Sequence, residues 1–178
     1  MKSRSGVVLA AAAFITVSCT RAVRVGSPPS TVTASTTIRD AAGRQIGTAT
    51  FVDTYAGVLI AGTVTGLGLG QHGIHVHETG RCEPPFTTAG GHFNPDKRHH
   101  GFKSADGYHA GDLPNVDVPA SGQLRFDLLL PGVTLTGAGG LLDGDGAAIV
   151  IHANGDDYTT DPAGNSGGRI ACGVIAAR

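Results

Sequence analysis

The chain of 178 residues has the length of one ordinary domain. Hydrophobic residues make up 40% and charged residues 15%, which is enough apolar material for a core and excludes a disordered or coiled-coil chain. The formal net charge is −1 and no run of lysine or arginine occurs, so we expect no nucleic-acid partner. Glycine and proline, at 28 and 9 residues, favour turns over long helices, and the 8 histidines require an explanation.

The first residues predict export. Lys2 and Arg4 precede an apolar run over residues 6–17, which is too short to span a bilayer and has the length of a signal-peptide core. The run ends in Thr-Val-Ser-Cys19, which resembles a bacterial lipobox, although threonine stands where leucine is usual. We expect residues 1–18 to be a lipoprotein signal peptide and Cys19 to carry a lipid that anchors the protein to a bacterial membrane. The location would be periplasmic or the cell surface. The alternative is an ordinary secretory signal with an incidental cysteine.

The cysteine count agrees with this interpretation, because three is an odd number for an exported protein. If Cys19 carries lipid, Cys82 and Cys172 remain to form a disulfide in an oxidising compartment. Residues 19–32 are small, polar or proline and suit a tether. The folded domain is therefore expected over residues 33–178.

Short β-rich runs follow, separated by turn residues, with no competing amphipathic helix. They cover residues 31–39, 45–54, 57–65, 73–78, 123–130, 147–152 and 170–175. This pattern predicts an all-β sandwich or barrel. Two long irregular stretches, residues 79–116 and 153–169, interrupt it, and loops of this length in a compact domain are usually functional.

Most of the histidines lie in or beside these two stretches. His75 and His77 are two apart in a predicted strand, so both rings can address one ion, although a surface strand can carry this pattern by chance. A second group lies in one glycine-rich loop: His92, His100, His109 and Asp112. A carboxylate with several imidazoles suits zinc, whereas an all-imidazole set suits copper.

His152, at the end of another predicted strand, completes the candidates. Two four-coordinate ions would need one ligand more than these residues provide. Either one ligand is shared between the two sites or one coordination position is open.

Four segments carry a resemblance to a known family: GIHVHETGRCEPPFTTAGGHFNP, YHAGDLPN, IVIHANGDDY and GNSGGRIACGV. In this order and spacing they resemble the copper,zinc superoxide dismutases, over about residues 33–178. The resemblance implies an eight-stranded antiparallel Greek-key β-barrel with two long functional loops. It also implies one copper and one zinc ion per chain and dismutation of superoxide to oxygen and hydrogen peroxide.

The resemblance also implies the ligands. Copper would be bound by His75, His77, His92 and His152, and zinc by His92, His100, His109 and Asp112. His92 would be the shared ligand and would store a proton during the reaction. The other implied roles are hydrogen bonds from Asp156 to both sites, a cation beside the copper channel from Arg169, and the disulfide of Cys82 and Cys172.

One feature departs from the family. Animal members carry a lysine before the channel arginine that attracts superoxide, whereas residues 153–168 here contain only aspartates as charged residues. Lys97, Arg98 and Lys103 are the nearest candidates for that role. We expect His72 to be structural and His99 to be a solvated loop residue.

The alternative function is a copper or zinc carrier or buffer outside the cytoplasm. Loss of Arg169 or of a copper ligand would favour the carrier, and neither is lost. The sequence favours neither a monomer nor a homodimer.

Overall fold

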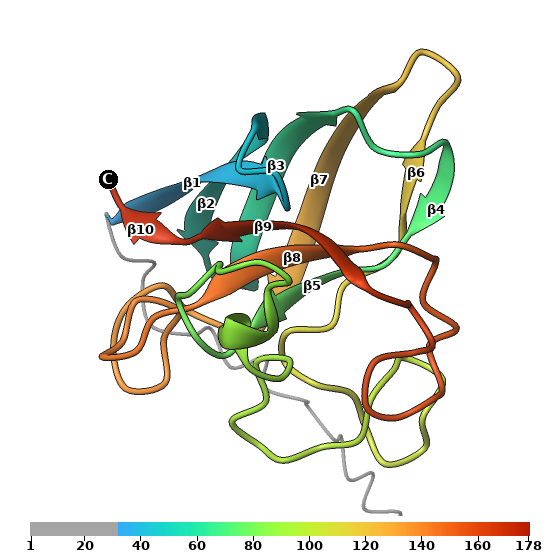
Figure 1. Cartoon of the computed structure of the whole chain (residues 1–178). Coiled ribbons are helices and arrows are strands. Elements are labelled where there is room, and N and C mark those ends of the chain that lie inside the picture. The colour runs from blue at the N-terminus through green and yellow to red at the C-terminus, as the bar shows by residue number, and fades with distance from the viewer. Residues whose placement is uncertain (1–31) are drawn as a thin grey trace, which may run out of the picture.

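A computed structural model describes residues 32–178 (Figure 1). The predicted signal peptide, the predicted lipidation site Cys19 and all but the last residue of the predicted tether lie outside the described residues. No helix within residues 32–178 is long and apolar enough to cross a membrane.

The described chain is built of antiparallel strands. They are β1 Thr33–Asp40, β2 Gln45–Thr54, β3 Gly57–Thr65, β4 Gly70–His72, β5 Ile74–His77, β6 Val116–Val118, β7 Gln123–Pro131, β8 Ala148–His152, β9 Arg169–Val174 and β10 Ala176–Ala177. The helical content of residues 32–178 is one 3-10 turn, Thr87–Ala89. The all-β prediction is therefore confirmed.

Eight strands form one curled sheet in the order β5-β8-β9-β1-β2-β3-β7, with β10 paired to β1, while β4 and β6 form a separate pair (Figure 1). Each predicted run coincides with a strand, and the ends of the run and the strand agree to within two residues. The predictions missed β4, β6 and β10, because two or three residues are too few to show an alternation.

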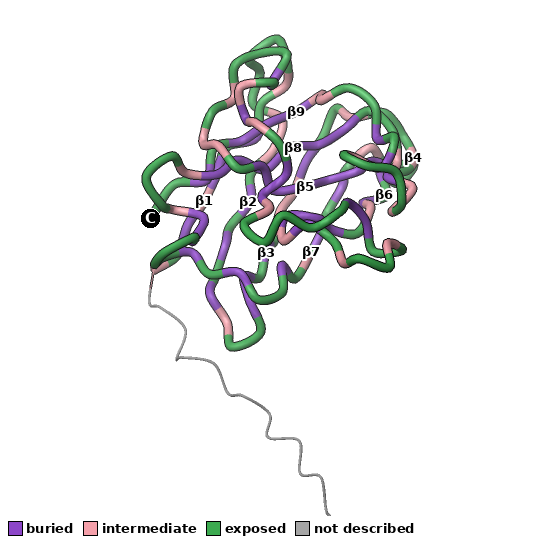
Figure 2. Tube along the Cα trace, turned by 90° about the horizontal axis from the view of Figure 1, so that it is seen from below, coloured by how far each residue is buried: buried purple, intermediate pink, exposed green. Residues whose placement is uncertain are grey.

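The core follows the period of two that an extended backbone imposes on its side chains. In β2, Ala49, Phe51 and Asp53 are buried while their neighbours are more exposed. Leu124, Phe126 and Leu130 of β7 repeat this pattern. Figure 2 shows the buried positions on the strands, with most exposed positions on the connections between them. These strands have one face on the core and the other in water.

Strands β5 and β8 differ, because every residue in both is buried. Their inward positions, such as Ile74 and Ile149, join the main core. The opposite face carries His75 and His77 on β5. Beside them is a second, smaller apolar cluster formed by Phe86, Ala89, Ala148, Val150 and Cys172. The two long loops therefore cover the outer face of this part of the sheet, and the histidines lie beneath them.

Candidate metal centre

Strand β5 pairs with β8 along one edge only. The loop that follows β5 is hydrogen-bonded to its other edge. Val76 donates its backbone N–H to Gly111 O at 2.9 Å and accepts from Phe93 N at 2.8 Å. A Cβ on Gly111 would lie 2.2 Å from Val76 O, so only glycine permits this approach. Isolated bridges pair His77 with His92 in the same way. Backbone pairing thus brings loop histidines beside the strand histidines.

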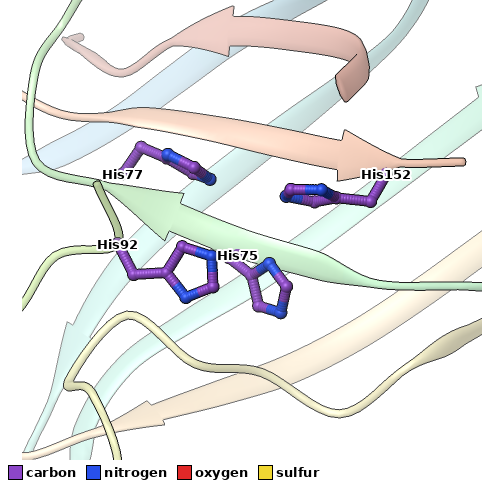
Figure 3. A group of neighbouring side chains, drawn as sticks. All are labelled: His75, His77, His92 and His152. Carbon is purple, nitrogen blue, oxygen red and sulfur yellow. The ribbon is translucent and has the colours of Figure 1, made fainter. Parts of the chain in front are cut away.

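A first group consists of four buried imidazoles, those of His75, His77, His92 and His152 (Figure 3). Two come from β5, one from the loop and one from the end of β8. Their potential ligand atoms lie within 4.8 Å of one another. One nitrogen on each ring, Nδ1 of His75 and Nε2 of the others, is buried without a hydrogen-bond partner. Since an unpaired buried polar atom is costly, these four nitrogens fit a bound metal ion.

On three of these rings the other nitrogen is hydrogen-bonded. The acceptors are Asp156 Oδ2 at 2.8 Å for His75 Nε2, Gly90 O at 3.1 Å for His77 Nδ1 and Gly167 O at 3.3 Å for His152 Nδ1. When a ring donates its proton outward, its second nitrogen presents a lone pair to the centre. The surroundings therefore select the tautomer that a metal ligand needs.

A second group gathers around Asp112. The Nδ1 atoms of His92, His100 and His109 lie 2.8, 3.1 and 3.3 Å from its Oδ1. Its Oδ2 accepts from the backbone N–H groups of Gly101 and His109. Three imidazole nitrogens with one carboxylate oxygen form a set that suits a tetrahedral zinc ion. His92 belongs to both groups, with Nδ1 in the second and the unpaired Nε2 in the first.

Asp156 connects the two groups. One carboxylate oxygen is 2.8 Å from His75 Nε2 and the other is 3.0 Å from His100 Nε2. The side chain of Asn115 holds the backbone of Asp156, because its Oδ1 accepts from Asp156 N and its Nδ2 donates to Asp156 O. One carboxylate thus orients a ring in each group.

Burial keeps three rings of the first group neutral, those of His77, His92 and His152. It lowers the pKa of His77 to about 2 and that of His152 to about 3, and neighbouring positive groups add to both shifts. Burial also lowers the pKa of His92 to about 4, against the opposing effect of Asp112. A neutral imidazole is the form that binds a metal.

Charge concentrates in the second group. Burial alone would lower the pKa of His100, but hydrogen bonds to Asp112 and Asp156 outweigh burial and raise it to about 9. Burial likewise opposes ionisation of Asp112, and its histidine partners still hold its pKa far below the usual range. Asp112 therefore stays ionised at neutral pH, and its negative charge favours a cation among these side chains.

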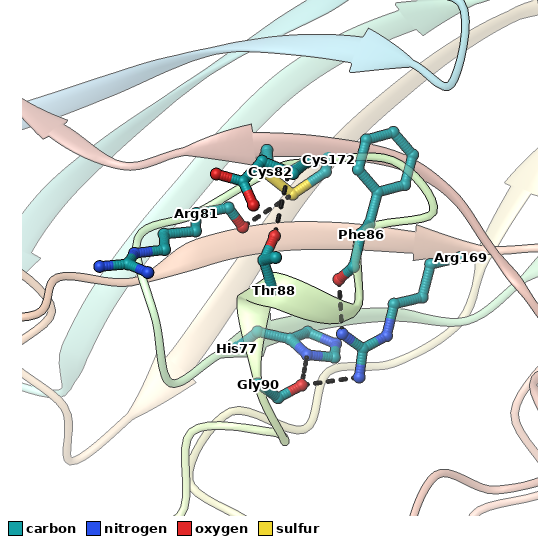
Figure 4. The surroundings of a disulfide bond; sticks show 9 residues. His77, Arg81, Cys82, Phe86, Thr88, Gly90, Arg169 and Cys172 are labelled. Atoms are coloured by element: carbon teal, nitrogen blue, oxygen red, sulfur yellow. Dashed lines mark hydrogen bonds between the residues drawn. A yellow bond between two sulfur atoms is a disulfide. The ribbon is translucent and has the colours of Figure 1, made fainter.

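Arg169, at the start of β9, is held beside His77 (Figure 4). Its Nη1 donates to Phe86 O at 2.7 Å and its Nη2 donates to Gly90 O at 2.6 Å. The guanidinium is part-buried, and both acceptors lie in the loop after β5. This arrangement presents a fixed cation next to the first histidine group.

The disulfide between Cys82 and Cys172 is confirmed, with Cα atoms 5.6 Å apart (Figure 4). Cys172 lies on β9, three residues after Arg169, and Cys82 lies in the loop that supplies Phe86 O. The bond therefore links the loop to the strand that carries Arg169.

Other predicted residues can be located as well. His72 is buried with both ring nitrogens near backbone carbonyls, those of His152 and Gly68, in agreement with a structural role. His99 is exposed, as expected for a loop residue. Its Nδ1 also lies 2.5 Å from Asp161 Oδ2. Exposed Lys103 lies 5.5 Å from the centre of the Tyr158 ring.

Sequence reasoning missed the groups that act through the backbone. The carbonyls of Phe86 and Gly90 leave no signature in the sequence, because every residue has a carbonyl. Asn115 and Asp161 also escaped notice, since a lone polar residue in a loop is usually a turn residue.

The amino-acid sequence is similar to those of known proteins. Residues 45–175 match the family model described as copper/zinc superoxide dismutase (SODC). The chain is 45% identical over 137 residues to superoxide dismutase [Cu-Zn] 1 of Aquifex aeolicus, an alignment covering 75% of this chain and 81% of that protein. It is 41% identical over 147 residues to superoxide dismutase [Cu-Zn] of Caulobacter vibrioides, covering 80% and 84%.

The fold is also similar to those of solved structures. The chain superposes on a SOD-like protein from Bacillus subtilis with a TM-score of 0.76 and 39% identity, covering 79% of this chain and 96% of that one. It superposes on the Cu/Zn superoxide dismutase from Brucella abortus with a TM-score of 0.67 and 28% identity, covering 81% and 99%. These likenesses support the expected Greek-key β-barrel architecture.

Proposed function

The chain belongs to the copper/zinc superoxide dismutase family, and we propose that its two histidine groups carry out the dismutation of superoxide with one copper and one zinc ion. Copper would be held by the first group, His75, His77, His92 and His152. Zinc would be held by the second group, His92, His100, His109 and Asp112. The donor sets support this assignment, since the first is all imidazole and the second includes a carboxylate.

The reaction converts two superoxide anions and two protons into oxygen and hydrogen peroxide. Copper held by the first group would supply the one-electron redox change that this reaction requires, which redox-inert zinc cannot do. The work of the protein is then to bind a small anion, to orient it and to provide a proton.

Arg169 binds and orients the anion. Its guanidinium is planar and always charged, and two backbone carbonyls fix two of its N–H groups. The remaining N–H groups can donate hydrogen bonds to a superoxide anion beside the first histidine group. Because the cation is already in place, binding the anion costs little reorganisation.

His92 supplies a proton. Its Nε2 is buried and unpaired in the first group, while its Nδ1 faces Asp112 in the second. Because His92 belongs to both groups, cations held by the two groups would favour loss of its ring protons, and Nε2 would then gain a proton in one half of the cycle and release it in the other. The peroxide formed from the second superoxide takes this proton and one from solvent.

The single observation that carries the proposal is the set of four unpaired buried nitrogens in the first group. The test is stopped-flow superoxide decay with the disulfide-bonded protein, loaded with copper and zinc or with zinc alone. Fast catalytic decay only with copper supports a dismutase. Stoichiometric copper binding without catalysis would favour a metal carrier instead.

We also propose that the protein is exported and lipid-anchored through Cys19, in the periplasm or at the cell surface. The basic residues, apolar run and cysteine of residues 1–19 support this, as does a disulfide, which persists in oxidising compartments. Cys19→Ser should abolish labelling by a fatty acid and release the protein from the membrane fraction of a bacterial host. Unchanged labelling would contradict the anchor.

A further inference from the structure

We propose that Asp161 is a positioning residue for the zinc site, acting through the backbone of His100 from the neighbouring loop. The inference rests on the proposed assignment of zinc to the second histidine group. Asp161 itself is not part of that group or of the first one. Its contacts are with the backbone N–H of His100 and the ring of His99.

Asp161 holds two consecutive residues with one carboxylate. Oδ1 accepts from the backbone N–H of His100 at 2.5 Å, and Oδ2 lies 2.5 Å from His99 Nδ1. A carboxylate that accepts from a backbone N–H makes a stronger bond than a neutral acceptor does. Asp161 lies 61 residues from His100 in sequence, so this bond joins separate loops.

The loop that presents Asp161 is itself ordered by hydrogen bonds. Asp157 accepts from the backbone N–H groups of Thr159 and Thr160, each at 2.8 Å, and from Asn165 Nδ2 at 2.9 Å. Thr160 O, the carbonyl just before Asp161, accepts from Gly164 N at 2.6 Å. The backbone around Asp161 is therefore held by contacts within its own loop, and the carboxylate reaches His100 from this ordered segment.

The position of the His100 ring depends on the position of the His100 backbone. Its ring is fully buried, with Nδ1 3.1 Å from Asp112 and Nε2 3.0 Å from Asp156. The next residue, Gly101, packs so tightly that a Cβ would lie 2.1 Å from Tyr158 O. A shift of the His100 backbone would move the ring away from both carboxylates. Asp161 opposes that shift at the backbone N–H.

The exposure of the Asp161 and His99 side chains distinguishes a positioning role from a role in folding stability. The side chain of Asp161 is 46% exposed and that of His99 is 63% exposed. Ion pairs exposed to this extent contribute little to folding stability. Removing the carboxylate should therefore leave the metal-free fold intact, and its effect should appear when zinc binds.

The experiment measures zinc affinity of the metal-free, disulfide-bonded protein by competition with a chromogenic chelator. We expect Asp161→Ala to weaken zinc binding by about tenfold, the lower end for residues that orient metal ligands. Asp161→Asn keeps an acceptor for His100 N and should lose less. His99→Gln, which leaves the bond to His100, should stay within about twofold of wild type.

Melting temperatures provide the second measurement, and Asp143→Asn, in another exposed loop, is the control for loss of one carboxylate. Asp161→Ala should melt like wild type without zinc and show a smaller zinc-induced rise. Zinc binding within twofold of wild type in Asp161→Ala, or an equal loss in His99→Gln, would overturn the inference. If Asp161→Ala does not fold, Asp161→Asn decides by the same criterion. Failure of the wild type to bind zinc would contradict the zinc site itself.

Discussion

Arg169 and His77 donate to the same acceptor, the carbonyl oxygen of Gly90, at 2.6 and 3.1 Å. One backbone carbonyl therefore fixes both the guanidinium of Arg169 and the tautomer of a histidine in the first group. Because Gly90 belongs to the loop that Cys82 ties to β9, the position of Arg169 depends on the disulfide as well as on its own strand.

Replacing Arg169 should slow superoxide decay without loss of copper. We expect Arg169→Ala to reduce the rate by about tenfold or more, since a fixed charge that stabilises a reacting anion is lost. Arg169→Lys keeps the charge but lacks the planar guanidinium that binds two carbonyls. Its rate should therefore lie between those of the wild type and Arg169→Ala. Stopped-flow rates normalised to copper content test this. Equal rates in all three proteins would contradict the role of Arg169.

Removing the disulfide should destabilise the fold. Cys82 and Cys172 are separated by 90 residues in sequence, and closing a loop of that length is worth about 4 to 5 kcal/mol, as an upper estimate. The free energy of unfolding of metal-free Cys82→Ser/Cys172→Ser, measured with urea, should fall by up to this amount. A loss near zero would show that the reduced chain is already constrained.

Neutralising the zinc-loop lysines should slow the reaction mainly at low salt. Lys103 Nζ is 3.4 Å from Asp157 O, so its charge lies against the loop that lacks lysine and arginine. Lys97→Gln/Lys103→Gln should therefore be slower than wild type at low ionic strength and approach it at high ionic strength, because salt screens exposed charges. Arg125→Gln, on the exposed face of β7, is the control. An unchanged salt dependence in the double variant would remove this proposal.

Asp157 should make stability depend on pH in acid. Hydrogen bonds from the backbone and hydroxyl of Thr160, and from Thr159, lower its pKa to about 2. A carboxyl whose pKa is lower in the folded state stabilises the fold above its unfolded pKa, near 4, and this contribution is lost as pH falls through the folded value. The difference in melting temperature between wild type and Asp157→Asn should be constant at pH 5 to 7 and shrink from about pH 4 to pH 2. A melting-temperature difference that does not change with pH would contradict this role of Asp157.

The strands and the histidine pair could be predicted from the sequence. Alternation along β2 and β7 reflects the local geometry of an extended backbone, so no knowledge of distant residues is needed. The same period places His75 and His77 on one face. The members of the two histidine groups and the disulfide could also be named in advance, the groups through the resemblance of whole segments to a known family.

What only the tertiary structure decided is how each group is oriented. The nitrogen by which His92 joins each group, the carbonyls that hold Arg169 and the bond from Asp161 to His100 all depend on contacts between separate loops or strands. Such contacts exist only after the loops have packed onto β5 and β8, and a single turn residue gives no sign of its distant partner. Local periodicity therefore determined the strands and the face that carries the strand histidines, while long-range hydrogen bonding determined the geometry of the candidate site.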